Sequence, residues 1–385
     1  MPTERPAAAP AAGPLPGYAA HFDEPEGYLD FARYGPPSRD VLTATADALA
    51  RAARADHRTV NALMRAEPAA RDSAARLAGS DPAHTVLLPN ASTGLFHAAF
   101  GIPTGTVLVP RTDFPANHYP WRRTEALSRA VPRWLEPDDR GRVTADVVRA
   151  ALGDGGDDVV ALAVSAVDFR TGFRADLGAL RDAIGPDRLL IVDAIQGFGI
   201  ADLPWQAADV VVAGGQKWLR ASWSTGFAAL SDRALERLEP TLTGWTGVED
   251  VALFDDLEHP PAAGAQRWSI SNLSPVAAAA FAAALAVVEE ATVPAIEARI
   301  AARVDELIDT VRGCGGEILS PTAPAERAGI VSFRLPGTDA AAVAEALHAH
   351  EVTPSVRATS VRLSPHASTR PAAADRVRAA LASLR

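Results

Sequence analysis

Between residues 85 and 230, short apolar runs alternate with stretches whose apolar residues recur at helical spacing. A short apolar run between turn residues is typical of a strand buried on both faces. Strands that alternate with helices favour a mostly parallel sheet with helices on both faces, so this region is predicted to be α/β and doubly wound. The predicted strands are Thr85–Leu88, Thr106–Val109, Val131–Leu135, Val159–Val164, Leu189–Val192, Val210–Ala213 and Gly226–Leu230.

The chain on either side of this region follows other patterns. Residues 38–78 are rich in Ala, Arg and Leu and predict helices, while Tyr28–Phe31 is a short strand-like segment. After residue 275 the pattern predicts one long helix, a strand, a helix, a second strand and a last helix, which is typical of a small α+β domain. These elements span roughly Pro275–Val311, Ile330–Leu335, 339–350, Val361–Leu363 and the residues from 371. The predicted division is a disordered tail at 1–17, an N-terminal segment at 18–40, a large domain at 41–265 and a small C-terminal domain at 266–385.

Composition and charge narrow the class of protein. The chain has 385 residues, 48% of them apolar, and a net charge of −10, which argues against nucleic acid or an anionic membrane surface as a partner. A single cysteine, Cys314, excludes a disulfide within the chain, argues against a cysteine-based metal site and fits a cytoplasmic protein. Residues 1–17 lack the basic start and apolar core of a signal peptide. The longest apolar run, Val276–Val288, has 13 residues, which predicts a buried helix rather than a membrane span.

Two neighbouring predicted strands end in residues that can do chemistry. Asp193 closes the strand Leu189–Val192, and Lys217 follows the next strand after a Gly-Gly turn. Ligands of open α/β sheets bind beyond the carboxyl ends of the strands, so this acid and this lysine are expected in one crevice. The pair suits pyridoxal phosphate (PLP), because the lysine can hold the cofactor as a Schiff base while the acid keeps the pyridine nitrogen protonated. A surface lysine and a helix-capping acid are the alternatives.

The order of five motifs resembles the class V family of PLP-dependent enzymes. Besides the segments of Asp193 and Lys217, the motifs are Asn90–Gly94, Asp113–Trp121 and Val361–Pro365. The family includes cysteine desulfurases, kynureninase, isopenicillin N epimerase-like proteins and ergothioneine-pathway C–S lyases. The resemblance implies PLP fold type I, with the N-terminal segment joined to the small domain and the active site between the domains. It also implies a homodimer with shared active sites.

Several residues are candidates for the cofactor's phosphate. Ala91, Ser92 and Thr93 open an apolar helix directly after a predicted strand. Free backbone N–H groups and a hydroxyl at a helix start bind phosphate, and ordinary N-capping by Ser or Thr is compatible with that role. Gln216 stands where several relatives have a histidine that touches the phosphate. Ser271 matches a hydroxyl that relatives supply from the partner subunit.

Other residues are candidates for the cofactor's ring. Phe114 and Asn117 lie in Phe-Pro-Ala-Asn, which resembles the kynureninase-type Phe-Pro-x-Asp, where the aromatic ring stacks on the pyridine. Core packing is the alternative for this phenylalanine. Gln196 matches the position that usually contacts the phenolic oxygen of the cofactor, and a polar residue at a helix start is the alternative there.

Arginines are the candidates for substrate binding. Arg362 lies in the C-terminal motif, and its planar guanidinium would bind the substrate carboxylate through two hydrogen bonds. A solvated arginine on a strand is the alternative. Arg357 is a second candidate, and Arg33, Tyr34 and Arg170 are expected to line the substrate entrance.

The chain departs from the desulfurases at one decisive position. Those enzymes need a nucleophilic cysteine on a long loop before the C-terminal arginine, and Val356–Arg362 has neither the cysteine nor room for the loop. Cys314 is expected at a helix-to-strand turn elsewhere, so persulfide chemistry on a protein thiol is disfavoured. Ala166 stands where many relatives carry an asparagine after the position of Ser165.

These observations favour a lyase that acts on an amino-acid substrate. Cα deprotonation followed by β-elimination from a cysteine S-conjugate is the prediction. An aminotransferase or epimerase of specialised metabolism is the alternative, and decarboxylation or kynureninase-like hydrolysis ranks lower. A PLP-fold protein that only binds a partner is disfavoured because Asp193 and Lys217 are both present. The loop 244–266 is expected to cover the pocket and help to select the substrate.

Overall fold

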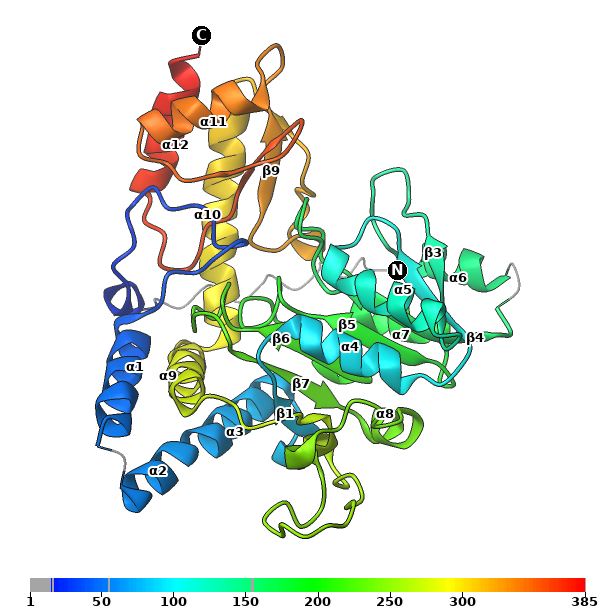
Figure 1. Cartoon of the computed structure of the whole chain (residues 1–385). Coiled ribbons are helices and arrows are strands. Elements are labelled where there is room, and N and C mark those ends of the chain that lie inside the picture. The colour runs from blue at the N-terminus through cyan, green and yellow to red at the C-terminus, as the bar shows by residue number, and fades with distance from the viewer. Residues whose placement is uncertain (1–14, 16, 55, 154–155, 385) are drawn as a thin grey trace, which may run out of the picture.

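The computed structural model describes residues 15, 17–54, 56–153 and 156–384. The tail predicted at 1–17 therefore lies almost entirely outside the described residues. In the described part, one large sheet and one small sheet lie side by side, and helices cover both (Figure 1).

The large sheet has seven strands in the order β1-β7-β6-β5-β4-β2-β3. Strands β3, β2, β4, β5 and β6 run parallel to one another, whereas β7 is antiparallel to both of its neighbours, β6 and β1. Every strand predicted between residues 85 and 230 forms to within one residue, so the mostly parallel α/β fold is confirmed, whereas the strand-like segment Tyr28–Phe31 forms isolated bridges only. The strands are β1 (Thr85–Leu87), β2 (Thr106–Pro110), β3 (Val131–Leu135), β4 (Val159–Ser165), β5 (Leu189–Asp193), β6 (Val210–Gly214) and β7 (Gly226–Leu230).

Successive side chains along a strand point to opposite faces, so each buried strand contributes to two cores. In β2, Val107 and Val109 belong to the core under α4, α5 and α8, whereas Leu108 belongs to the core under α3, α6, α7 and α9. Continuous apolar strands are therefore needed here, because neither face of the sheet meets water. These helices are α3 (Ala66–Ala78), α4 (Ala91–Gly101), α5 (Tyr119–Ala126), α6 (Ala145–Gly153), α7 (Leu177–Ile184), α8 (Asp232–Arg237) and α9 (Pro275–Ala291).

The small sheet has four antiparallel strands in the order β10-β11-β9-β8. Two of them, β9 (Val331–Arg334) and β11 (Val361–Leu363), were predicted, as were the helices α11 (Ala340–Ala349) and α12 (Ala372–Ala382). The other two, β8 (Glu317–Ile318) and β10 (Ser355–Val356), are too short to show an alternating pattern.

The prediction of one long helix from 275 to 311 is wrong. The segment forms α9 and α10 (Val293–Gly313), which meet at 81°. Thr292, between them, has a positive φ of 65°, and Pro294 has no N–H to donate to the carbonyl of the preceding turn. Among the described residues no single helix is long and apolar enough to cross a membrane. Only α9 and α10 together meet that test of length and composition, as a bent pair.

The N-terminal segment contacts the small sheet. Tyr28 and Asp30 form isolated bridges with Thr353 and Ser364, next to β10 and β11. The helices α1 (Arg39–Ala52) and α3 then pack against α9, with α2 (His57–Met64) between them in the chain. The domain limits at residues 40 and 265 stay a prediction.

Candidate active site

Strands β5 and β6 bring Asp193 and Lys217 to the same edge of the sheet. The two strands are parallel neighbours in which Asp193 pairs with Val212, and Lys217 follows the end of β6 at Gly214. The turn that joins β6 to Lys217 is tight, because a Cβ on Gly215 would lie 2.3 Å from the hydroxyl of Thr225. The predicted adjacency of the two strand ends is therefore observed, and a ligand crevice between them stays a prediction.

The environment of Asp193 and Lys217 changes the pKa of both groups. Asp193 is 2% exposed, one oxygen accepts a hydrogen bond of 3.0 Å from the N–H of Ile195, and burial raises its pKa to about 6. Burial lowers the pKa of Lys217 to about 8, and the positive charges of Arg362 and Arg357 act in the same direction. The Lys217 ammonium makes no hydrogen bond or ion pair with the described residues. It lies 5.4 Å from the centre of the Phe114 ring.

The start of helix α4 lies against β6. A Cβ on Gly94 would come within 2.5 Å of the Val212 side chain, so the helix approaches the strand as closely as backbone atoms allow. Asn90 caps the helix by accepting the N–H of Thr93 at 2.9 Å. N-capping by Ser92 or Thr93 is therefore wrong, and the hydroxyl of Ser92 has no partner among the described residues. The arrangement leaves backbone N–H groups at a helix start near the lysine-bearing strand.

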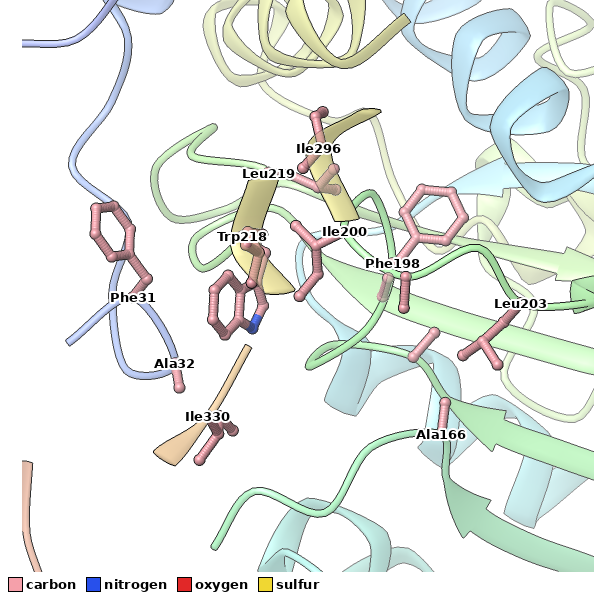
Figure 2. Packing of buried hydrophobic residues seen from close by; sticks show 14 of the residues in the cluster. Phe31, Ala32, Ala166, Phe198, Ile200, Leu203, Trp218, Leu219, Ile296 and Ile330 are labelled. Carbon is pink, nitrogen blue, oxygen red and sulfur yellow. The ribbon is translucent and has the colours of Figure 1, made fainter. Parts of the chain in front are cut away.

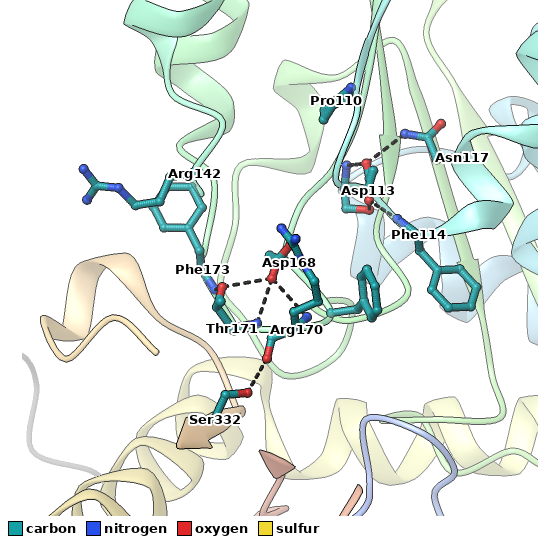
Figure 3. A network of polar contacts seen from close by, with 12 residues as sticks. Pro110, Asp113, Phe114, Asn117, Arg142, Asp168, Arg170, Thr171, Phe173 and Ser332 are labelled. Carbon is teal, nitrogen blue, oxygen red and sulfur yellow. Dashed lines mark hydrogen bonds and ion pairs between the residues drawn. The ribbon is translucent and has the colours of Figure 1, made fainter. Parts of the chain in front are cut away.

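Phe114 stays partly open beside the lysine. Its ring is 40% exposed, so the alternative of core packing does not hold. Asn117, in contrast, is buried and uses its side chain internally: it donates to Asp113 at 2.9 Å and accepts from Trp121 at 3.2 Å. Asp113 also accepts the N–H groups of Phe114 and Ser165 (Figure 3). The motif Asp113–Trp121 begins with Asp113, for which the sequence predicted no role. Its hydrogen bonds attach the loop that contains Phe114 to Ser165 at the end of β4.

Gln196 is occupied by contacts within the chain. Its amide nitrogen donates to the carbonyl of Ala32 at 2.9 Å, and its amide oxygen accepts from the indole of Trp218 at 2.7 Å. Figure 2 shows Trp218 and Leu219 among apolar side chains from the N-terminal segment, α10 and the start of β9. The residue after Lys217 is thus anchored in the core. A contact between Gln196 and the phenolic oxygen stays a prediction.

The other predicted cofactor contacts also remain predictions. The backbone carbonyl of Gln216 accepts from the N–H of Gly35 at 2.9 Å. Ser271 is exposed in the segment before α9, and its hydroxyl makes no hydrogen bond with the described residues. A position on the surface is compatible with a contribution from a partner subunit.

Arg362 is buried and already held by protein oxygens. Its guanidinium donates to the carbonyl of Phe169 at 2.7 Å and to the hydroxyl of Ser355 at 2.9 Å, and it lies 3.3 Å from Asp30. Burial, followed by the nearby charge of Arg357, lowers its pKa to about 10. Its buried Nε has no partner among the described residues. A solvated strand arginine is therefore wrong, and the carboxylate clamp stays a prediction.

The aromatic ring of Phe169 contacts Phe114 and two of the candidate arginines. It meets the Phe114 ring edge-on at 5.1 Å, and the guanidinium groups of Arg357 and Arg170 lie 5.6 Å and 5.9 Å from its centre. Arg170 pairs with Asp168 at 3.1 Å. Elsewhere in the predicted entrance, Tyr34 stacks on Trp223 with 4.3 Å between ring centres, and Arg33 is exposed.

A buried ion pair, which the sequence did not reveal, holds the segment after Lys217. Arg220 is 2% exposed and binds both oxygens of Glu24, at 2.6 Å and 3.2 Å. Its Nε donates to the carbonyl of Pro36 at 2.6 Å, and its φ is positive, at 59°. The N-terminal segment therefore fixes the lysine-bearing loop through side-chain and backbone bonds. Arg220 could have been noticed as a charge in a buried stretch, but nothing near Glu24 pointed to it.

No hydrogen bond, ion pair or ring contact joins the loop 244–266 to Lys217 among the described residues. The loop carries several exposed apolar side chains, among which Phe254 is 84% exposed and Leu257 73%. The role predicted for this loop at the pocket therefore stays a prediction.

The sequence is similar to known enzymes over most of its length. Residues 28–380 match the family described as Aminotransferase class-V. Kynureninase of Deinococcus radiodurans is 30% identical over 210 residues, which span 51% of each chain. Isopenicillin N epimerase of Streptomyces clavuligerus is 28% identical over 302 residues, 72% of this chain and 74% of that enzyme.

Solved structures of low sequence identity share the fold. The complex of the cystine C–S lyase C-DES with cysteine persulfide superposes with a TM-score of 0.84 at 18% identity, over 92% of this chain and 97% of that one. The apo cysteine desulfurase of Thermococcus onnurineus gives a TM-score of 0.81 at 18% identity, over 93% of both chains. The architecture predicted from the resemblance is confirmed.

Proposed function

Because the chain belongs to the class V aminotransferase family, whose cofactor is pyridoxal phosphate, we propose that it is a lyase that cleaves the Cβ–S bond of a cysteine S-conjugate. The observation that carries the proposal is a single available lysine, Lys217, which follows the strand next to that of Asp193. No cysteine thiol lies beside it. Elimination needs one base, and it releases the sulfur with the rest of the substrate instead of passing it to the protein.

The described residues fit the cofactor part by part. Among the described residues nothing pairs with the amine of Lys217, which could take the aldehyde, or with the second oxygen of Asp193, which could take the pyridine nitrogen. The start of α4 offers N–H groups for the phosphate, and the exposed ring of Phe114 lies beside the amine. When bound, pyridoxal phosphate joins the substrate's amino group and withdraws electrons from Cα.

Lys217 has the properties of a base at neutral pH. With a pKa of about 8, an appreciable fraction of its amine is neutral near pH 7, whereas an ordinary lysine would be almost fully protonated. We expect Lys217 to take the proton from Cα and to return it to the departing sulfur. Arg362 would hold the α-carboxylate and so orient the Cα–H bond toward this amine.

The surroundings of Lys217 support elimination over two other reactions of the family. The turn between β10 and β11 contains no cysteine, and Cys314 is buried at the end of α10, where its sulfur lies 4.0 Å from the carbonyl of Arg378. A protein persulfide would therefore form far from the lysine. Epimerisation by two bases needs a second group on the other side of Cα. Asp30, the acid that affects the pKa of Lys217 most after Asp193, is already bound to Ser355 and Arg362.

Pyruvate release from cysteine S-conjugates tests the proposal. The purified holoenzyme should produce pyruvate, ammonia and the free thiol in equal amounts, and Lys217→Ala should abolish all three. Cys314→Ala is the matched control and should leave the rate unchanged, because the thiol lies in the core of the small domain. Pyruvate that depends on Cys314 would contradict the proposal. Amino-group transfer to a keto acid without pyruvate would favour the aminotransferase alternative.

We also propose that the enzyme is a homodimer with shared active sites. The exposed apolar side chains of Val251, Leu253, Phe254 and Leu257 support this, because soluble chains rarely leave such a group in water. Light scattering should give twice the chain mass, and Phe254→Ser should shift the mass toward one chain. A wild-type monomer that retains full activity would contradict this proposal.

A further inference from the structure

Arg357 is held beside the candidate active site by a backbone hydrogen bond and by a contact with an aromatic ring, and neither contact uses the N–H donors of its guanidinium. Its N–H donates to the carbonyl of Ser360 in the turn between β10 and β11, and its guanidinium lies 5.6 Å from the centre of the Phe169 ring. That ring meets Phe114, and Phe114 lies 5.4 Å from the Lys217 amine. Three short contacts therefore lead from the lysine to the arginine across two aromatic rings.

Among the described residues, no carboxylate pairs with the guanidinium of Arg357. None of the ion pairs among the described residues includes Arg357, whereas its neighbours are paired: Arg170 with Asp168 at 3.1 Å and Arg362 with Asp30 at 3.3 Å. The uncompensated charge depresses the pKa of both Lys217 and Arg362. An exposed arginine is usually just solvated. This one instead lies next to an amine and a second arginine, where an anion would relieve the repulsion of three positive groups.

The geometry of the hairpin sets the spacing of the two arginines. Arg362 pairs with Ser355 across the hairpin, and Arg357 lies two positions further toward its tip. At about 3.3 Å per residue, the two side chains start roughly 7 Å apart along the strands. A ligand whose α-carboxylate binds Arg362 would reach Arg357 with a group several bonds along its side chain.

We propose that the substrate carries a second negatively charged group at the end of its side chain, and that Arg357 binds that group. This inference rests on the proposed function and deepens it: the S-conjugate ends in a carboxylate or a similar anion. Guanidinium groups bind carboxylates through paired N–H donors, and the flat ring of Phe169 holds the guanidinium in place without using those donors.

Two isosteric ligands separate this inference from the proposed reaction. L-2-Aminoadipate and its side-chain amide have the chain length of S-carboxymethyl-L-cysteine and S-carbamoylmethyl-L-cysteine, but a methylene replaces the sulfur, so neither can eliminate. Calorimetric titration of the holoenzyme should give an affinity for the acid at least about tenfold higher than for the amide. Arg357→Gln should remove this preference and leave the affinity for the amide unchanged.

The controls use arginines with different roles. Arg378→Gln, on the exposed side of α12, changes the net charge equally and should retain the preference. Arg362→Gln should weaken both ligands alike. Equal affinity for acid and amide in the wild type, or an equal loss of both in Arg357→Gln, would overturn the inference.

Turnover of S-carboxymethyl-L-cysteine and S-carbamoylmethyl-L-cysteine distinguishes a failure of the proposed anion site from a failure of the proposed lyase activity. If the acid binds more tightly through Arg357 but neither conjugate yields pyruvate, the anion site stands and the lyase does not. If both conjugates yield pyruvate at equal kcat/KM and the two isosteres bind equally, the lyase stands and the anion site does not.

Discussion

Replacing Glu24 by Gln tests whether the buried ion pair with Arg220 holds the lysine-bearing loop. The side chains are 2% exposed for Arg220 and 8% for Glu24, and two donor–acceptor distances of 2.6 Å and 3.2 Å make the contact bidentate. Removing one partner of a buried pair costs about 3–5 kcal/mol, because the other charge stays buried without compensation. Arg220 would retain Ser368, the carbonyl of Pro36 and the ring of Phe22, 3.6 Å away. We therefore expect a loss of about 3 kcal/mol, at the low end of that range.

Chemical denaturation of the cofactor-free protein measures this loss as a change in the free energy of unfolding. Replacing both partners, as Glu24→Met with Arg220→Met, should recover most of it, because a buried pair exchanged for apolar residues is often neutral. A loss below about 1 kcal/mol for Glu24→Gln would be typical of an exposed pair and would refute the reasoning. The affinity for pyridoxal phosphate should fall in Glu24→Gln as well, since the pair lies at the loop that carries Lys217.

The pKa of Glu24 determines how the stability difference between wild type and Glu24→Gln changes with pH. Burial alone would raise the pKa of Glu24, but the hydrogen bonds and the charge of Arg220, with help from Ser368, outweigh it and hold the pKa below the ordinary value of 4.5. A carboxyl with a depressed pKa in the folded state contributes stability above its unfolded pKa and loses it as the pH falls through the folded one. The difference between wild type and Glu24→Gln should therefore be full at neutral pH and shrink below about pH 4.5.

Three further predictions concern the lysine and its surroundings. The rate of covalent reconstitution of the cofactor-free protein with pyridoxal phosphate, followed by absorbance, should rise with pH through a midpoint near the Lys217 pKa of about 8, because the neutral amine is the nucleophile; a midpoint near 10.5 would contradict the burial effect. Asp193→Asn should lower kcat by about a hundredfold or more while the cofactor still binds covalently, since the buried charge that stabilises the protonated pyridine is lost; an unchanged kcat would remove that role from Asp193. Gly35→Ala would place a Cβ 2.0 Å from the Lys217 carbonyl and should weaken cofactor binding, whereas Gly313→Ala, with nothing within 4 Å, should not; equal effects would show that the close approach is unimportant.

The elements that could be predicted are those whose information lies in local sequence. The strands β5 and β6 are continuous apolar runs, so their ends, and with them Asp193 and Lys217, followed from pattern alone. The break between α9 and α10 at Thr292 could not be predicted from the pattern, because the sequence on both sides has helical spacing. Nothing in that spacing marks the positive φ of this one residue. Pro294 was the available signal.

The contacts that could not be predicted join distant parts of the chain. The carboxyl of Glu24 and the guanidinium of Arg220 are 196 positions apart, and no spacing rule relates them. The same holds for Arg362, whose role as a substrate clamp was expected from a motif. Its bonds to Phe169 and Asp30 depend on how β11, the loop after β4 and the N-terminal segment meet. Asp113 was predictable in part. Its motif is visible in the sequence, but its function in joining the ends of β2 and β4 depends on the register of these two strands.

The contacts of the N-terminal segment determine when the site can form during synthesis. Asp30 and Arg362 are separated by 332 positions, and the segment that fixes the Lys217 loop also bonds to Ser364 and Ser368. Loop closure over such a span is slow, and a nascent chain still lacking its last strand has no partner for these residues. The large sheet can fold on the ribosome first, whereas a tight cofactor site can appear only after residues 362–368 have been made and have left the ribosome. Pulse-labelled chains should therefore acquire protease resistance in the sheet before they acquire the cofactor's absorbance.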